Sequence, residues 1–122
     1  MELVRSLPAS AAASGLARPA VDLVVGTGTV SESADQVRVL ADELIAESAA
    51  HARDDIIELR VRSDPRSIRM EVAWTGRPSG VTATQPETFQ GHAAAIDRLA
   101  DRWGGTSDGE RRTLWAERST PR

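Results

Sequence analysis

The chain has 122 residues, of which 40% are apolar and 27% charged, and its formal net charge is −3. This length supports one domain with one core, and the balance of apolar and charged residues is that of a soluble globular protein. The acidic net charge argues against a nucleic-acid binder, which usually presents a basic face. Because the chain has no cysteine, disulfides, thiolate catalysis and Cys-ligated zinc are excluded.

All 15 residues counted as Lys or Arg are arginine. Arginine in place of lysine, together with abundant alanine, is typical of a GC-rich genome such as that of an actinobacterium. The absence of lysine removes Schiff-base chemistry and the lysine of a phosphate-binding P-loop. The sequence contains no run of about 18 apolar residues and no signal-peptide pattern, so we expect a cytoplasmic protein that contacts no membrane.

Residues 3–7 predict a short edge strand that ends at Pro8. An Ala-rich helix follows, with Ser10 as its expected N-cap. The residues expected to be buried on this helix are Leu16, Ala20, Leu23 and Val24. Pro19 lies inside the pattern and predicts a kink or a late start. The segment 26–28, Gly-Thr-Gly, is interpreted as a connector, since a lone G-x-G is weak support for an anion site.

The clearest helical pattern covers residues 32–51, where apolar side chains recur at helical spacing. Its expected buried face consists of Val37, Leu40, Ala41, Leu44, Ile45, Ser48 and Ala52. Two alternating patterns follow at residues 57–61 and 68–72, and each predicts a strand with one buried face. The Asp-Pro-Arg turn at residues 64–66 joins the two strands into a hairpin.

Residues 76–90 are interpreted as a loop, and residues 90–103 predict a helix that Gly104 stops. A last strand is expected at residues 113–117. The predicted fold is therefore α+β, a two-layer sandwich of a mixed, mostly antiparallel sheet with helices on one face. Residues 1–122 form one domain in this prediction, with residues 119–122 frayed.

Three segments resemble one known family. Residues 42–52 read DELIAESAAHA, residues 70–76 read MEVAWTG, and residues 91–104 read GHAAAIDRLADRWG. In this order they resemble the boxes of the histidine-kinase/Hsp90-like (GHKL, Bergerat-fold) ATPases, in the branch of anti-sigma factor serine kinases. The family's boxes are E-L-x-x-N-A followed by His, a strand ending in D-x-G, and G-x-G-L before a helix ending in L-A-D-R-W-G. The resemblance covers nearly the whole chain and implies a Bergerat fold.

The departures from these boxes fall on the nucleotide contacts that the family uses. Glu47 stands where the family's asparagine coordinates Mg²⁺. Trp74 replaces the aspartate that binds the adenine amino group, and indole has no acceptor for that contact. Ala93 replaces the second glycine of G-x-G, where a Cβ hinders close approach of the backbone to phosphate. A lost hydrogen-bond partner costs about 1–3 kcal/mol, so we expect a vestigial nucleotide site.

Other family positions are retained. Gly76, Gly91 and Thr113 match the nucleotide-binding pattern, and Glu43 matches the residue proposed to activate the acceptor hydroxyl in the intact family. If the site is active, the resemblance implies that Glu43 is the catalytic base and that Glu47 holds Mg²⁺.

The preferred interpretation is a degenerate anti-sigma-like, partner-switching regulator, in effect a pseudokinase, with no cofactor. The resemblance implies a protein partner such as a sigma factor or an anti-sigma antagonist, and a possible homodimer. One alternative is an active serine kinase that uses ATP and Mg²⁺. Another is a small-molecule sensor with a pocket rebuilt around Trp74.

Two groups of polar residues have competing interpretations. Glu43, Glu47 and His51 fall on one helix face, where they suit a metal or acid–base site, but a polar helix face is favoured. Arg60, Arg62 and Arg69 occupy the polar positions of the hairpin. They suit either an acidic partner helix or a solvated sheet face, with Glu58 and Glu71 as ion-pair partners. The remaining tryptophans, Trp103 and Trp115, are expected to be core anchors.

Overall fold

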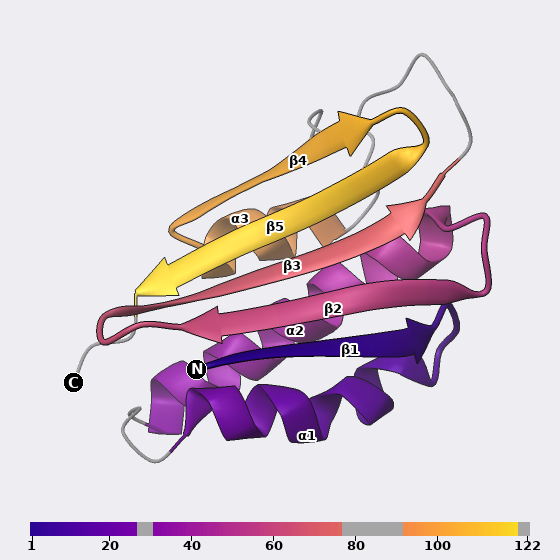
Figure 1. The fold of residues 1–122 in the computed structure, drawn as a ribbon. Coiled ribbons are helices and arrows are strands. Elements are labelled where there is room, and N and C mark those ends of the chain that lie inside the picture. Colours follow the sequence, from indigo (N-terminus) through magenta and orange to yellow (C-terminus); the bar gives the residue numbers. More distant parts are fainter. Residues whose placement is uncertain (27–30, 77–91, 120–122) are drawn as a thin grey trace.

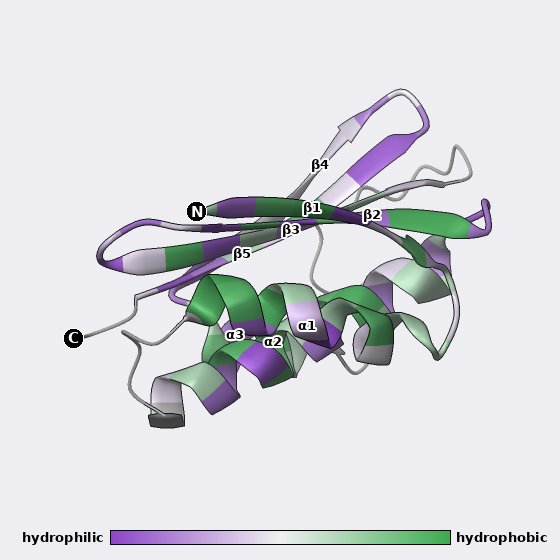
Figure 2. Ribbon diagram, turned by 60° about the horizontal axis from the view of Figure 1, so that its bottom comes forward, coloured by the Kyte–Doolittle hydropathy of each residue, from purple (hydrophilic) through white to green (hydrophobic). Residues whose placement is uncertain are grey.

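The computed structural model describes residues 1–26, 31–76 and 92–119, in which a five-stranded sheet carries three helices on one face (Figure 1). The elements in chain order are β1 (Glu2–Pro8), α1 (Ala13–Val25), α2 (Ser31–His51), β2 (Ile56–Ser63), β3 (Ser67–Thr75), α3 (His92–Leu99), β4 (Arg102–Asp108) and β5 (Arg111–Ser119). Turning the molecule brings the two layers into view, with the sheet above and the helices below (Figure 2). The predicted α+β sandwich is confirmed.

The strands lie in the order β1-β2-β3-β5-β4. All four pairings among these strands are antiparallel, so the sheet contains none of the parallel pairing that a mixed sheet would add. β1 and β4 are the two edges of the sheet. Because β5 inserts between β3 and β4, the last hairpin of the chain lies beside the central hairpin formed by β2 and β3.

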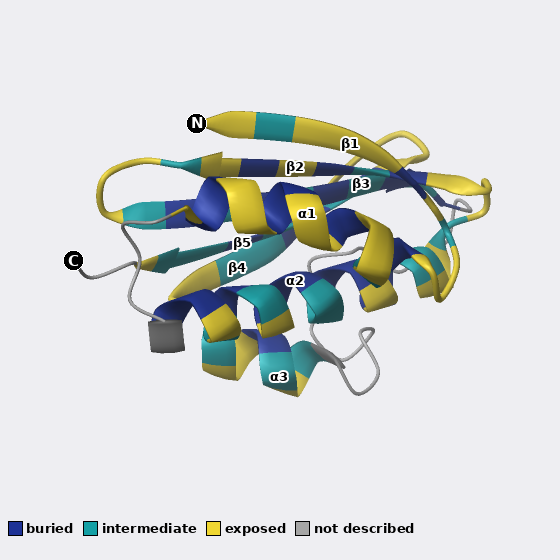
Figure 3. Ribbon diagram, turned by 90° about the horizontal axis from the view of Figure 1, so that it is seen from below, coloured by how far each residue is buried: buried dark blue, intermediate teal, exposed yellow. Residues whose placement is uncertain are grey.

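The core lies between the sheet and the helices, and alternate strand residues supply one side of it (Figure 3). The inward side chains of the three central strands are Ile57, Leu59, Val61, Ile68, Met70, Val72, Trp74, Leu114 and Ala116. The helix α2 supplies the other side with Val37, Leu40, Ala41, Leu44, Ile45 and Ser48, all buried as predicted. Burial of one large aliphatic side chain stabilises the fold by about 1.5–3 kcal/mol, so this layer holds the domain together.

The buried face of α1 differs from the prediction. Ala20 and Val24 are buried as predicted, but Leu16 and Leu23 are 57% and 59% exposed. The other buried residues of the helix are Ala13, Ala17, Val21 and Val25. The prediction was wrong for both leucines because the phase of the helix is set by its contacts with α2. Arg18 pairs with Asp42 at 3.0 Å on that side, and Leu16 and Leu23 lie on the side of the helix away from it.

The start of α1 also differs in detail. The helix begins at Ala13, and its N-cap position is Ala12, which makes no side-chain cap hydrogen bond. The Ser10 hydroxyl instead accepts a hydrogen bond from the Ala12 N–H at 3.3 Å, in the turn before the helix. Pro19 lies inside the helix, which begins six residues before it, so Pro19 does not delay the start of the helix, and a kink there stays a prediction.

The predicted helix at residues 90–103 ends earlier, at Leu99, and β4 follows it. The prediction missed this strand because Gly104 was interpreted as a helix stop. Gly104 is paired with Trp115, and a Cβ on Gly104 would lie 3.2 Å from the Trp115 ring. Glycine therefore makes room for an indole that crosses the strand. Trp103 is half-buried, and its Nε1–H donates to Asp97 Oδ1 at 3.0 Å.

Hydrogen bonds to aspartate side chains fix the β2–β3 turn and the end of β5, which lie at the same end of the sheet. Asp64 Oδ1 accepts hydrogen bonds from the N–H groups of Arg66 and Ser67, both at 2.9 Å, which confirms the predicted hairpin turn. Ser119, which was expected to fray, donates its N–H to Asp101 Oδ2 at 2.6 Å. Residues 120–122 lie outside the described residues. No helix within the described ranges is long and apolar enough to cross a membrane.

Candidate functional site

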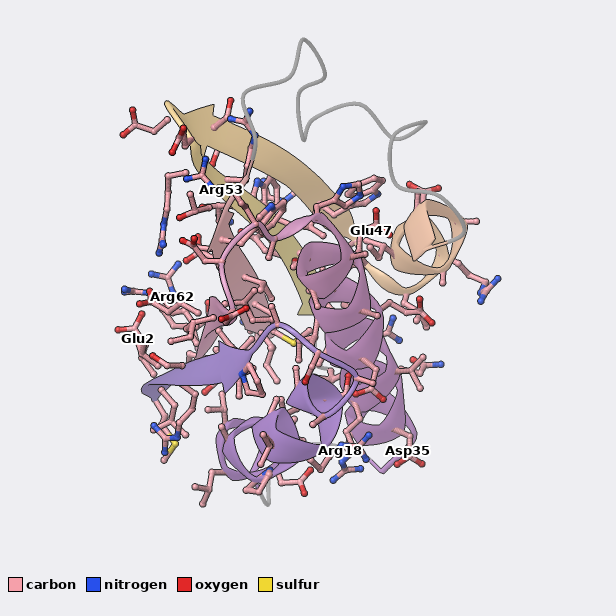
Figure 4. The ribbon with its side chains drawn as sticks, turned by 90° about the vertical axis from the view of Figure 1, so that its right-hand side faces the viewer. Glu2, Arg18, Asp35, Glu47, Arg53 and Arg62 are labelled. Carbon is pink, nitrogen blue, oxygen red and sulfur yellow. The ribbon has the colours of Figure 1, made fainter. Side chains whose placement is uncertain are left out.

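The last two turns of α2 carry the polar residues that the sequence singled out. Glu47 is 2% exposed, and its Oε1 lies 2.7 Å from Nε2 of His51, one turn further on. Glu43, one turn earlier on the same face, is half-buried. Figure 4 shows Glu47 near the end of α2, on the helix layer. This face therefore combines two carboxylates with an imidazole, and the more deeply buried carboxylate already has an intramolecular partner.

The end of β3 places Trp74 in the core. The side chain is 2% exposed and follows Met70 and Val72 on the inward face of the strand. A Cβ on Gly76 would lie 3.4 Å from Trp74 Nε1 and 3.3 Å from Arg112 Cγ. The indole thus packs against the backbone of Gly76, a position where a larger residue would force its neighbours to move.

The strand β5 contributes Arg112 and not Thr113 to this region. Arg112 is the cross-strand partner of Trp74 and is 9% exposed, and its Nη1 donates to the Gly109 carbonyl at 2.8 Å. Thr113 pairs with Ala73 and lies on the opposite face of the sheet. The expected role of Thr113 in nucleotide binding stays a prediction, and in this fold the sheet separates its side chain from Glu47 and Trp74.

Three chain segments meet at this end of the molecule. The Arg53 N–H, just after α2, donates to the Thr75 carbonyl at 2.8 Å. The Gly76 N–H donates to the carbonyl of Glu110 at 2.9 Å, in the turn between β4 and β5. The Arg53 guanidinium also binds the Glu110 carboxylate at 2.8 Å, and this hydrogen bond raises the pKa of Arg53. The end of α2, the end of β3 and the start of β5 are thereby held together.

The third box of the resemblance is described only in part. Ala93 lies in the first turn of α3 and is half-buried against the core. Gly91 lies outside the described residues. Residues 77–90, interpreted from sequence as a loop, also lie outside them.

The three hairpin arginines lie on the open face of the sheet, away from the helices. Arg60 pairs with Glu2 at 3.3 Å, and Figure 4 shows Glu2 and Arg62 on this side. Arg69 binds Glu71 at 3.2 Å, as the solvated-face interpretation expected. Its guanidinium also lies 4.4 Å from the centroid of the Trp115 ring, so Trp115 lies on this face and is no core anchor.

Ion pairs occupy most of this face. Glu117 binds both Arg69 and Arg102, and these hydrogen bonds lower its pKa. Glu58 pairs with Arg111 at 3.7 Å and not with a hairpin arginine. Arg62 makes no ion pair with any other described residue.

No cluster of three or more His, Asp or Glu side chains able to hold a metal ion occurs in the described part of the chain.

Comparison with known proteins gives the fold. No family model matches the sequence, and no curated protein matches it. The fold is similar to the crystal structure of the RsbU and RsbW domains of Rv1364c from Mycobacterium tuberculosis, with a TM-score of 0.67 and 14% identity. The match covers 99% of this chain and 33% of that chain. The chain has a histidine-kinase-like ATPase fold.

A second solved structure has a similar fold. The histidine kinase domain of the blue-light activated histidine kinase EL346 from Erythrobacter litoralis matches with a TM-score of 0.57 and 17% identity. That match covers 93% of this chain and 61% of the kinase chain. This chain therefore spans about a third of the first structure's length and three-fifths of the second's. In the histidine-kinase-like ATPase fold of this chain, Glu47, Trp74 and Arg112 lie on the helix side of the sheet, at the end where α2, β3 and β5 meet.

Proposed function

We propose that this chain is a regulator that acts by binding a protein partner, and that its histidine-kinase-like ATPase fold no longer uses ATP. The observation that carries this proposal is the burial of Trp74, which is 2% exposed and belongs to the core. By resemblance, this is the position from which the family's aspartate accepts the adenine amino group. The indole at this position is packed in the core and offers a hydrogen-bond donor only.

Glu47 supports the same conclusion. By resemblance it occupies the position of the Mg²⁺-binding asparagine, and its side chain is 3% exposed and hydrogen-bonded to His51. A carboxylate can bind Mg²⁺, but this one would have to leave its partner and its buried site first. Glu43 would add a second negative charge near the triphosphate. An active kinase would need both carboxylates to face the nucleotide.

Arg112 supports a remodelled site as well. The residue faces inward beside Trp74, where the resemblance led us to expect the threonine of the last strand. A buried guanidinium needs acceptors, and Arg112 has one in the Gly109 carbonyl. Glu47 and Arg112 therefore have hydrogen-bond partners within the chain, and Trp74 is packed in the core, without a nucleotide. The loss of two or three contacts at about 1–3 kcal/mol each would weaken ATP binding by several orders of magnitude.

The fold and the resemblance both support the partner class that we propose. The RsbW domain in the first comparison structure and the anti-sigma boxes in the sequence both favour a partner-switching regulator that binds a sigma factor or an anti-sigma antagonist. Without a nucleotide, the switch is competition between partners, because a ligand shifts an equilibrium only through differential affinity. On the open sheet face, Arg62 is the candidate contact for an acidic partner, since Arg60 and Arg69 already have intramolecular ion pairs.

Affinity capture from the native host tests this function. The tagged chain is used in extract that contains millimolar ATP and Mg²⁺, and in extract depleted of ATP by apyrase. We expect the same stoichiometric protein partner in both samples. Recovery of no stoichiometric partner, or recovery only when ATP is present, would contradict the proposal. The matched variant Arg62→Glu should weaken the capture, whereas Arg98→Glu, exposed on α3, should not.

A further inference from the structure

The environment of Arg62 differs from that of the other arginines on the open sheet face (Figure 4). In the strand pairing, Arg62 lies directly between Glu2 of β1 and Arg69 of β3. Glu2 binds Arg60 instead, with 3.3 Å between Glu2 Oε1 and Arg60 Nη1. On its other side Arg62 meets a like charge, and like charges directly opposite each other destabilise a sheet.

Arg69, in contrast, has partners within the chain. Its guanidinium donates to Glu71 at 3.2 Å and to Glu117 at 2.5 Å, and it lies over the ring of Trp115. These contacts hold the Arg69 side chain and occupy both of these carboxylates. Arg62 therefore lies beside a fixed guanidinium and has no ion-pair partner of its own among the described residues.

The β2–β3 turn adds a second arginine of this kind. Arg66 is exposed in the turn, and its side chain forms no ion pair within the described part of the chain. The carboxylate between the two arginines in sequence, that of Asp64, accepts hydrogen bonds from the Arg66 N–H and from the N–H and hydroxyl of Ser67, all at 2.9 Å. These hydrogen bonds lower the pKa of Asp64, with a smaller contribution from the charge of Arg62. Asp64 therefore stabilises the turn and makes no ion pair with either guanidinium.

We name Arg62 and Arg66, with the turn that joins them, the hairpin corner, and we propose that it binds carboxylate side chains of an acidic segment in a protein partner. Each guanidinium offers N–H donors in a fixed fork that can hold a carboxylate through two hydrogen bonds. A carboxylate on Arg62 would also offset the repulsion from Arg69. This inference rests on the proposed function in one respect only, that the ligand is a protein.

The surroundings of the hairpin corner disfavour a polyanion. Glu2 and Glu117 lie in the same cross-strand row as Arg62, and Glu71 lies two residues along β3 from Arg69. A nucleic acid carries a phosphate on every nucleotide, so its neighbouring phosphates would meet these carboxylates. One or two carboxylates match the guanidiniums that lack ion pairs, and the charge pattern therefore fits an acidic protein segment.

NMR of the arginine Nε–H groups tests the hairpin corner, with blocked synthetic peptides as probes. One peptide carries two glutamates, and the control peptide has glutamine in their place. We expect saturable shifts of the Arg62 and Arg66 signals with the glutamate peptide only. Arg62→Gln and Arg66→Gln should each weaken binding by about two- to fivefold, the range of an exposed ion pair. The matched control Arg98→Gln, exposed on α3, should leave binding unchanged.

Urea denaturation at low ionic strength gives a second readout that needs no peptide. Arg62→Gln removes a like charge from beside Arg69 and should raise the denaturation midpoint. Arg60→Gln breaks the ion pair with Glu2 and should not raise it. The increase for Arg62→Gln should disappear in about 1 M salt, which screens exposed charges.

The inference is overturned if the Arg62 and Arg66 signals move no more than that of Arg98. It is also overturned if a thymidine oligonucleotide or a phosphoserine peptide shifts them at lower concentration than the glutamate peptide does, or if the Arg62→Gln midpoint does not rise. Any of these results leaves the proposed function standing, because affinity capture with and without ATP tests that function separately. Conversely, capture of no partner would contradict the proposed function even if the glutamate peptide binds.

Discussion

Replacing Trp74 by alanine should destabilise the domain by about 3–5 kcal/mol, the range measured for truncation of large buried aromatics. The structure supports this magnitude because the side chain is 2% exposed. A buried tryptophan removes about 150–250 Å² from water, which corresponds to about 4–6 kcal/mol at 25 cal/mol per Å². Against a typical total stability of about 5–15 kcal/mol, the variant would be marginally folded.

Urea denaturation followed by far-ultraviolet circular dichroism measures this loss without depending on the removed fluorophore. Trp115→Ala is the matched control, because its indole is half-exposed on the open face and contacts Arg69. That contact is worth about 0.5–1 kcal/mol at an exposed site, so the control should lose clearly less stability.

If Trp74→Ala does not fold, Trp74→Phe retains most of the buried ring and should fold with an intermediate loss. A loss below about 0.5 kcal/mol for Trp74→Ala would place the residue among ordinary surface positions and refute the reasoning. In that case Trp74 would be free to stack on a ligand or a partner, and the main support for a lost nucleotide site would disappear.

Three further outcomes are expected. Glu47→Asn alone should not restore ATP binding in titration calorimetry, because Trp74 still stands where the resemblance places the adenine-binding aspartate. Micromolar affinity in this variant would contradict that expectation. Gly104→Val should cost about 1–3 kcal/mol in urea denaturation, since its Cβ would start 3.2 Å from the Trp115 ring, and an unchanged midpoint would show that the ring moves freely. Hydrogen bonds from Arg102 and Arg69 hold the pKa of Glu117 below its ordinary value of 4.5, so the unfolded chain binds more protons and stability should fall as the pH drops below about 4.5. Glu117→Gln should flatten that dependence, and an equally steep acid limb in the variant would show that Glu117 does not contribute to it.

The parts of the fold that the sequence predicted are those with strong local periodicity. The helix α2 has an apolar residue on every turn, and the strands β2 and β3 alternate strictly on both sides of an Asp-Pro-Arg turn. In each, the pattern that identifies the element also identifies its buried face. Trp74 lies near the end of β3, where the resemblance to a strand ending in D-x-G placed it.

The features that the sequence did not predict, the strand β4 and the buried face of α1, depend on contacts between distant segments. The strand β4 exists because Gly104 makes room for Trp115, a partner eleven residues further on that local propensity does not include. The phase of α1 depends on the packing of its alanine and valine side chains in the core, which the apolar spacing of α1 alone does not determine. Leu16 and Leu23 therefore looked like core residues.

Arg112 was missed although a signal was present. If Leu114 is the residue of the last strand that faces inward, alternation places Arg112 inward and Thr113 outward. The resemblance to the family's last strand favoured Thr113 instead. The correct face depends on the pairing of β5 with β3, which puts Arg112 opposite Trp74.

The central claim, that the fold has lost its use of ATP, is tested most directly by the melting temperature of the purified chain with and without millimolar ATP and Mg²⁺. A ligand at 100 times its dissociation constant stabilises a protein by about 2.7 kcal/mol, which corresponds to about 10 °C for a domain of this size. We predict no shift beyond that produced by the same concentration of Mg²⁺ and pyrophosphate. A reproducible, concentration-dependent rise of several degrees with ATP alone would contradict the account and return the chain to the active kinases of its fold.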